Sequence, residues 1–306
     1  MEAYKKEAKL NKTEVQYLDL IGSVAKLEHT SDATKLSVRE NSLMVGHIPS
    51  TKYLAIRGLG FGNIARQFAE LFSDKIEINT TVHEIVYHGQ DNASVKYVDG
   101  GKMMQVAAKT VLVTVSLGVL KAGNIKFTPS LPTYKQEVID GMGFGLANKC
   151  AMYWNNAEDM VWPEEQFWFE LISTEETKWN SFFNPSAYKD TQTLTAWIGG
   201  SDALEMEKLT DDEILDMVVK NLKSMFPSIK RPDKVVITRW SQDENTRGTY
   251  SYETVNRNWE EDTEKLRRNV GSLWFAGEAT DDSMHETTIG AWDSGREAAQ
   301  EMMKRL

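Results

Sequence analysis

Lys149 is the residue whose surroundings point most directly to chemistry. It lies in the apolar segment "LANKCAMYW", which is typical of a strand in a protein core. A charged lysine is costly to bury, so it must reach water, pair with an acid, or titrate with a lowered pKa. A lysine of this kind beside a glycine turn is a candidate catalytic group. A side chain that extends to water, or a structural ion pair, is the alternative interpretation.

The segment "LWFAGEATDDSMHETTIGAWDSGREAAQEMM" directs a strand and a helix toward the same small volume. Leu273–Ala276 predicts a buried strand, and Gly277 leaves room for a ligand to approach the backbone where that strand ends. Thr287 and Thr288 predict the start of a helix, whose free N–H groups and positive dipole end attract a phosphate or a developing negative charge. Four small residues keep this helix thin: Gly290, Ala291, Ser294 and Gly295. An ordinary strand, loop and closely packed helix remain the alternative.

Three aromatic residues lie in a third segment, "RWSQDENTRGTYSY", around a predicted turn. Trp240, Tyr250 and Tyr252 could line a slot for a planar cofactor or an aliphatic substrate, or they could pack in a core. A metal site is not expected, because the histidines show no metal-binding spacing and Cys150 is the only cysteine.

The composition is that of a globular protein with an acidic surface. The chain has 306 residues, with 35 basic and 45 acidic side chains and a formal charge of −10. This charge argues against a nucleic-acid partner and suits cationic ligands such as polyamines, although it also serves solubility. No signal peptide or membrane span is predicted. The C-terminal Lys304-Arg305-Leu306 partly matches a peroxisomal tripeptide, so the compartment stays open between cytoplasm and peroxisome.

Helices and strands alternate along the whole chain, which predicts an α/β or mixed α+β class. Strands are expected at Ile76–Ile78 and Val82–Val86, in a hairpin with its turn at Asp99–Gly101, and at Val111–Val115. The last of these is almost wholly apolar and β-branched, as in a parallel sheet covered on both faces.

Three helices are predicted with distinct signals. The incomplete GxGxG motif in "RGLGFGNIARQFAELF" precedes a helix with Ile64, Phe68, Leu71 and Phe72 on one face, and it favours a tight turn over a dinucleotide site. Thr210–Glu213 is a capping box that begins another helix. The third runs from about Ile289 to Arg305.

Five segments, in this order and spacing, resemble the flavin-dependent amine oxidases: "TVSLGVL", "FTPSLPTYK", "GMGFGLANK", "RWSQDENTRGTYSY" and "FAGEATDDSMHETTIGAWDSGREAA". The resemblance runs from about Arg57 to the C-terminus and is closest to polyamine oxidases and the amine-oxidase domain of histone lysine demethylases. It implies a partial FAD-binding, Rossmann-like domain interleaved with a substrate domain built on a mixed β-sheet with flanking helices. The implied boundaries are 1–51 and 146–258 for the substrate domain, and 52–145 and 259–306 for the FAD-binding domain.

The resemblance also implies roles for single residues on the cofactor side. The backbone of Val82 matches a valine that pairs with the adenine, and Gly277 with Glu278 matches the contact to the ribose and diphosphate. Thr287 and Thr288 match the two residues at the flavin ring.

On the substrate side, Lys149 matches a catalytic lysine that holds a water against the reactive nitrogen of the flavin. Trp240 matches a tryptophan beside the ring, and Tyr250 matches an aromatic residue that lines the amine slot.

The implied reaction is hydride transfer from an amine, most simply a polyamine, to non-covalently bound FAD, followed by reoxidation with O2 to give H2O2. The substrate is then a small amine, and no protein partner is specified.

Two departures from the family pattern matter. Ile289 stands where relatives often have histidine, and the family's initial strand, GxGxxG turn and helix have no counterpart. The chain is therefore expected to begin inside the substrate domain and to bind FAD weakly by itself. A catalytically silent paralogue or binding fragment, and a demethylase-like oxidase, are the alternative functions.

Overall fold

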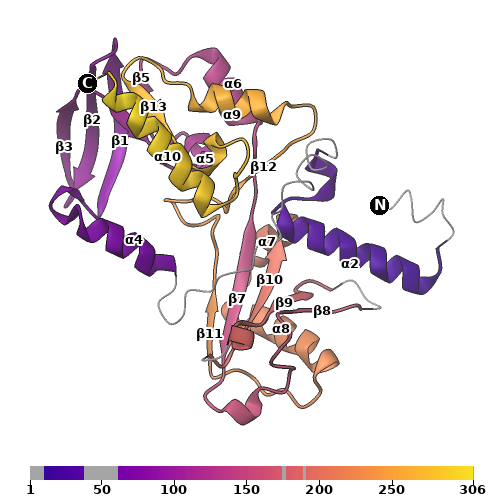
Figure 1. The fold of residues 1–306 in the computed structure, drawn as a ribbon. Coiled ribbons are helices and arrows are strands. Elements are labelled where there is room, and N and C mark those ends of the chain that lie inside the picture. Colours follow the sequence, from indigo (N-terminus) through magenta and orange to yellow (C-terminus); the bar gives the residue numbers. More distant parts are fainter. Residues whose placement is uncertain (1–9, 38–60, 174–176, 189–190, 306) are drawn as a thin grey trace. The chain divides into compact units, whose positions relative to one another are not determined.

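The computed structural model describes residues 10–37, 61–173, 177–188 and 191–305 and divides into two compact units (Figure 1). Unit 1 comprises Met1–Ser37 and Gly143–Val255, and unit 2 comprises Val38–Met142 and Asn256–Leu306. Each unit combines segments that are far apart in the sequence. Both contain helices and strands, which confirms the predicted mixed α/β class.

Unit 1 is built on a five-stranded sheet in the order β11-β7-β10-β9-β8, in which every neighbouring pair is antiparallel. The strands are β7 (Ala147–Tyr153), β8 (Trp168–Glu170), β9 (Ser181–Phe183), β10 (Thr193–Gly199) and β11 (Lys234–Ile237). A separate two-stranded pair joins β6 (Gly143–Phe144) to β12 (Ser251–Tyr252).

Side-chain alternation along β7 separates the two faces of this sheet. Cys150 and Met152 are 0% exposed and join the core cluster, whereas Lys149 points to the opposite face and is half-buried. The core face is covered by α8 (Asp211–Met225), whose buried Ile214, Val218 and Leu222 recur at helical spacing. The expected capping box is confirmed, because Thr210 and Glu213 exchange hydrogen bonds.

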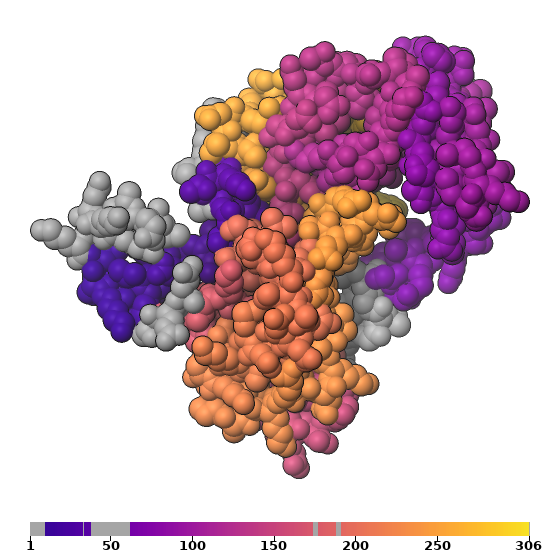
Figure 2. All heavy atoms as spheres, turned by 180° about the vertical axis from the view of Figure 1, so that it is seen from behind, coloured from indigo at the N-terminus to yellow at the C-terminus, as the bar shows by residue number. Residues whose placement is uncertain are grey.

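Two further helices and three short 3₁₀ turns are described in unit 1. They are α2 (Lys12–Glu28), α7 (Gly200–Met206) and the short 3₁₀ turns η1 (Ala33–Lys35), η3 (Ala157–Asp159) and η4 (Pro185–Tyr188). Helix α2 packs on β10, and a Cβ atom at Gly199 would lie 2.4 Å from the Lys26 carbonyl oxygen, so glycine is required there. The atoms of the α7–α8 region, orange in Figure 2, form an outer surface of this unit.

Unit 2 contains a four-stranded sheet in the order β3-β2-β1-β5 and a parallel pair, β13-β4. The strands are β1 (Thr80–His88), β2 (Asn92–Asp99), β3 (Lys102–Ala108), β4 (Val111–Val113), β5 (Lys126–Thr128) and β13 (Leu273–Phe275). The β2–β3 hairpin confirms the predicted turn at Asp99–Gly101. One core cluster joins the two sheets, because Ile85 of β1 packs with Leu273 and Phe275 of β13.

The helices of unit 2 are α4 (Phe61–Glu70), α5 (Leu117–Ala122), α6 (Thr133–Gly141), α9 (Trp259–Arg267) and α10 (Thr288–Met303), with 3₁₀ turns η2 (Ser73–Lys75) and η5 (Glu278–Thr280). The C-terminal helix and the strand before it confirm the predictions for that segment. None of the helices in the described ranges is long and apolar enough to span a membrane.

Three sequence predictions for unit 2 were wrong in part. Ile76–Ile78 is not a strand, and Ile78 is 75% exposed. Helix α4 ends at Glu70, so Leu71 and Phe72 lie beyond it, and the expected apolar face is exposed. The apolar strand predicted at Val111–Val115 ends at Val113. Periodicity shows which residues could share a face, but it does not show which neighbour covers that face. The glycine turn at 57–60 lies outside the described residues.

Lys135 joins α6 to the end of α9. Its side chain is fully buried, and Nζ donates to the carbonyl oxygens of Lys265, Leu266 and Arg268 at 3.0, 2.7 and 2.7 Å. The same Nζ lies 4.0 Å from the ring centroid of Phe275 in β13. One side chain therefore satisfies three backbone acceptors at a helix end and anchors that end to the strand.

We expect Lys135→Met to lower the free energy of unfolding by about 3 kcal/mol, because three buried carbonyl groups lose their hydrogen-bond donor. Thermal unfolding followed by circular dichroism measures this loss. Lys109→Met is the control, since Lys109 is exposed. Equal melting temperatures for the two variants would contradict the anchoring role of Lys135.

Candidate active site

Gly277 lies two residues after the end of strand β13, in a conformation that suits glycine. Its backbone angles are φ 135° and ψ 168°, a region that other residues rarely adopt. The Ser294 hydroxyl of α10 lies 3.1 Å from both the N–H and the carbonyl oxygen of Gly277. The strand end and the last helix are thereby held together within unit 2. Apart from Gly277 and its two chain neighbours, no atom of the described residues lies within 4 Å of the position that a Cβ of Gly277 would take.

Thr287 caps the start of α10. Its hydroxyl accepts from the Gly290 N–H at 3.0 Å and donates to the Met284 carbonyl oxygen at 2.6 Å. The N–H groups of Thr288 and Ile289 belong to the first helical turn, and neither has a partner among the described residues. Thr288 is exposed, so these two donors and the dipole end of α10 are accessible to a ligand.

Close packing accounts for Gly290 but not for Gly295. A Cβ atom at Gly290 would lie 2.1 Å from the Met284 carbonyl oxygen, so the loop can approach the helix only because glycine stands there. At Gly295 the same test finds open space. The expected thin helix is thus required by packing at Gly290, whereas open space at Gly295 leaves room beside α10.

Glu278 holds the loop that leads into α10. Its carboxylate accepts a hydrogen bond from the Glu286 N–H at 2.9 Å, and Glu286 has a positive φ of 64°. This bond connects the turn after β13 to the residue just before the Thr287 cap. Gly277, Glu278, Thr287 and Thr288, all singled out from the sequence, therefore surround one loop.

Val82 lies on β1, in the core that also contains β13. It pairs with Tyr97 of β2, and the register shifts between Val82 and Glu84. Pairing of β1 with β5 covers only Glu84–Val86, so Val82 lies beyond the end of that ladder. A strand residue past the end of its neighbour has backbone groups that a ligand can use.

In unit 1, Lys149 packs against an aromatic ring. Its Nζ lies 4.1 Å from the ring centroid of Trp197, its register partner on β10. No carboxylate of the described residues forms an ion pair with Lys149, and burial lowers its pKa. A face-on cation–π contact thus holds a lysine that the structure leaves without an acidic partner.

A buried polar network fixes the backbone around Lys149. The neighbouring Asn148 is fully buried, and its amide oxygen accepts from the Thr238 hydroxyl at 2.9 Å and from the Trp240 N–H at 3.2 Å. The amide nitrogen of Asn148 donates to the buried Glu207 carboxylate at 2.8 Å. Trp240, expected beside a flavin ring, is partly buried and packs against the core of unit 1.

Tyr250 lies near the N-terminal end of β7, the end that also contains Asn148 and Lys149. Its hydroxyl donates to the Glu28 carbonyl oxygen at 2.9 Å, at the end of α2, and its own carbonyl oxygen accepts from the Gly145 N–H at 2.8 Å. Lys149, Trp240 and Tyr250 are thus connected through β7 and the residues that hydrogen-bond to it. Their roles toward a substrate or a cofactor stay predictions.

Sequence reasoning missed Trp197 and the acceptor Glu207. Trp197 lies in β10, but the local sequence pattern does not show the register that places it opposite Lys149. Glu207 follows α7 and looks like one of many surface acids in the sequence. A glutamate that is almost fully buried becomes recognisable only when its hydrogen-bond partners are known.

Comparisons with known proteins show which family this chain belongs to. A family model described as flavin containing amine oxidoreductase matches residues 7–303. Polyamine oxidase 4 of Oryza sativa subsp. japonica is 34% identical over 200 residues, which cover 65% of this chain and 40% of that protein. Lysine-specific histone demethylase 1 homolog 1 of the same organism is 33% identical over 234 residues, 70% of this chain and 26% of that protein.

A solved structure of wild-type putrescine oxidase bound to putrescine superposes with a TM-score of 0.67 at 18% identity, covering 80% of this chain and 53% of that one. This likeness shows the fold. The chain spans less than half the length of the two curated relatives named above. The fold and the family match define a protein of the flavin amine oxidase class, and the chain belongs to the flavin containing amine oxidoreductase family.

We expect Gly277→Ala to destabilise the protein by about 1–3 kcal/mol, because alanine does not favour the backbone angles of Gly277. Gly295→Ala is a matched control, since it also adds a methyl group in open space, but inside a helix, where alanine is favoured over glycine. Urea unfolding of both variants measures the difference. A loss of stability in Gly295→Ala as large as in Gly277→Ala would refute the backbone explanation.

The lowered pKa of Lys149 predicts a pH-dependent contribution to stability. The folded-state pKa lies below the unfolded value of about 10.5, so the unfolded state binds more protons between these two values. Wild type should therefore gain stability relative to Lys149→Met as the pH rises through this window, and lose that gain as the pH falls. Urea unfolding at a series of pH values measures the difference. A difference that does not change with pH would show that burial leaves Lys149 unperturbed.

Proposed function

We propose that this chain contributes to the FAD-dependent oxidation of an amine, most simply a polyamine. The observation that carries the proposal is the junction of Gly277 with the start of α10, where there is open space at Gly277 and two N–H groups of the first helical turn have no partner among the described residues. The similar polyamine oxidases support the substrate class. The mixed fold and the family match support the cofactor class.

The residues of unit 2 fit a flat, anionic cofactor. An N–H pair at a helix start is a suitable partner for a group that gains negative charge on reduction. Thr288 and Ile289 would face the pyrimidine edge of the flavin, Gly277 and Glu278 would border its ribose and diphosphate, and the backbone of Val82 would meet the adenine. Non-covalent binding is part of the proposal, and residues 52–145 and 259–306 form its FAD-binding part.

When bound, the flavin would supply the two-electron oxidation of the carbon next to the amine nitrogen, with O2 as final acceptor and H2O2 as product. The predicted substrate part, residues 1–51 and 146–258, would bind the amine. Lys149, whose pKa is lowered by burial, would hold a water at the reacting centre. Trp240 and Tyr250 would exclude bulk water and align an unprotonated amine, so activity should rise as the pH approaches the pKa of that amine.

The test of this proposal is flavin loading followed by peroxide release. Purified chain titrated with excess FAD should shift the flavin absorbance bands, and spermidine or spermine should then give H2O2. Thr288→Pro should weaken flavin retention, because proline at the first helical position keeps the helix but removes its N–H. Thr288→Ala, which retains the N–H, should keep wild-type retention.

Flavin absorbance bands that stay unchanged in the presence of excess chain would refute the proposal for this chain. Equal flavin retention by Thr288→Pro and Thr288→Ala would remove the helix start from the cofactor site. Peroxide formed from a methylated-lysine peptide but not from polyamines would assign a demethylase-like substrate instead.

A further inference from the structure

Four side chains form a row across the sheet of unit 1, one from each of four neighbouring strands. The register pairs Glu170 of β8 with Ser181 of β9, Ser181 with Trp197 of β10, and Trp197 with Lys149 of β7. Directly paired residues of antiparallel strands point to the same face. Lys149 and Glu170 therefore share one face of the sheet, with their backbones about 14 Å apart at ordinary strand spacing.

Glu170 is a half-buried carboxylate without a cation. Its Oε2 accepts a hydrogen bond from the Ser181 hydroxyl at 2.7 Å, and it forms no ion pair with any lysine or arginine of the described residues. Burial raises its pKa, and the Glu28 carboxylate adds to the rise, while the Ser181 hydrogen bond opposes it. A carboxylate in such a place is stabilised by any ligand that brings a positive charge.

An aromatic surface lies between Glu170 and Lys149. The Trp168 ring centroid is 5.9 Å from that of Trp197 and 5.2 Å from that of Phe183. Trp168 is 46% exposed, so this surface is accessible to a ligand. Aromatic faces suit both methylene chains and cationic nitrogens.

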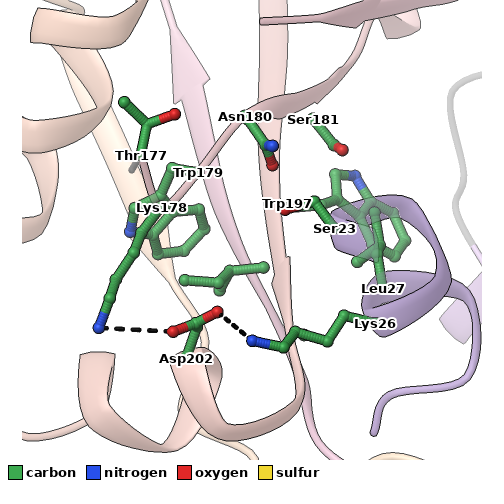
Figure 3. Close-up of a pocket in the computed structure, with 12 residues that line it drawn as sticks. Ser23, Lys26, Leu27, Thr177, Lys178, Trp179, Asn180, Ser181, Trp197 and Asp202 are labelled. Atoms are coloured by element: carbon green, nitrogen blue, oxygen red, sulfur yellow. Dashed lines mark hydrogen bonds and ion pairs between the residues drawn. The ribbon is translucent and has the colours of Figure 1, made fainter. Parts of the chain in front are cut away.

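A small pocket opens beside this row (Figure 3). Ser181 and Trp197 line it together with Ser23 and Leu27 of α2. Glu170 does not line this pocket; the carboxylate that does is Asp202, which already has cationic partners. Its oxygens lie 2.6 Å from Lys26 Nζ and 3.5 Å from Lys178 Nζ. Of these two carboxylates, Glu170 in the row is therefore the one whose charge a ligand would compensate.

We propose that Glu170 determines substrate specificity by binding a protonated nitrogen of a polyamine whose reacting nitrogen lies at the Lys149 end of the row. This inference rests on the proposed amine oxidation and assigns the group that would distinguish polyamines from monoamines. The reacting nitrogen must be neutral, whereas every other nitrogen of a polyamine stays protonated and needs an acidic partner. Trp197 and Trp168 contact the methylene chain between the two nitrogens.

The test is calorimetric titration of the full chain with spermidine and with octylamine, which needs no bound flavin. Wild type should bind spermidine more tightly than octylamine, and Glu170→Gln should weaken spermidine binding by about tenfold or more while leaving octylamine unchanged. Glu165→Gln is the matched control, because it removes the same charge from an exposed side chain. In flavin-loaded protein, Glu170→Gln should raise KM for spermidine more than it lowers kcat.

Equal losses in Glu170→Gln and Glu165→Gln would reduce the effect to overall charge and overturn the inference. So would wild-type chain that binds no spermidine, or Glu170→Gln that binds it as wild type does. Glu170-dependent binding in a chain that takes up no FAD would leave the specificity residue in place and remove the oxidase proposal. Peroxide formation from spermidine that is the same in wild type and in Glu170→Gln would keep the oxidase proposal and overturn the role of Glu170.

Discussion

The hydrogen bonds of the Ser294 hydroxyl to the backbone of Gly277 hold together the part of unit 2 on which the candidate cofactor site depends. They join a strand end to the second turn of α10 and thereby position the open space at Gly277 near the first N–H groups of that helix. Glu278 adds a second connection through the Glu286 N–H. A ligand that used both features would meet a surface whose donors are already in place, which lowers the cost of reorganisation on binding.

In unit 1 the corresponding constraint is the accommodation of a half-buried lysine, Lys149, on a strand of the sheet. The alternation of β7 sends Cys150 and Met152 into the core and leaves Lys149 on the other face. There the ring of Trp197 supports its ammonium group, while Asn148 and Glu207 satisfy the buried polar groups nearby. The lysine is positioned by packing and hydrogen bonds of its neighbours, and its own charge has no acidic partner among the described residues. This is the environment in which a lysine pKa falls.

Local signals predicted the elements well where chemistry and periodicity agreed. The capping box at Thr210, the turn at Asp99–Gly101 and the helix after Thr287 each depend on a few neighbouring residues, and each is present. Predictions were wrong where an apolar pattern had to be assigned to a partner. Ile76–Ile78 and the face of α4 are apolar but exposed, because amphipathic spacing cannot show whether another element covers it.

The sequence by itself determined the family, through five ordered motifs, and the residues that begin α10 and occupy β7, because these depend on local composition and spacing. Only the tertiary structure decided that Trp197 lies over Lys149, that Ser294 binds Gly277, and that Glu170 stands in the same row as Lys149. These pairings depend on strand register and helix packing between segments up to tens of residues apart. Such long-range contacts arise from the energy of the whole core, which no short stretch of sequence records.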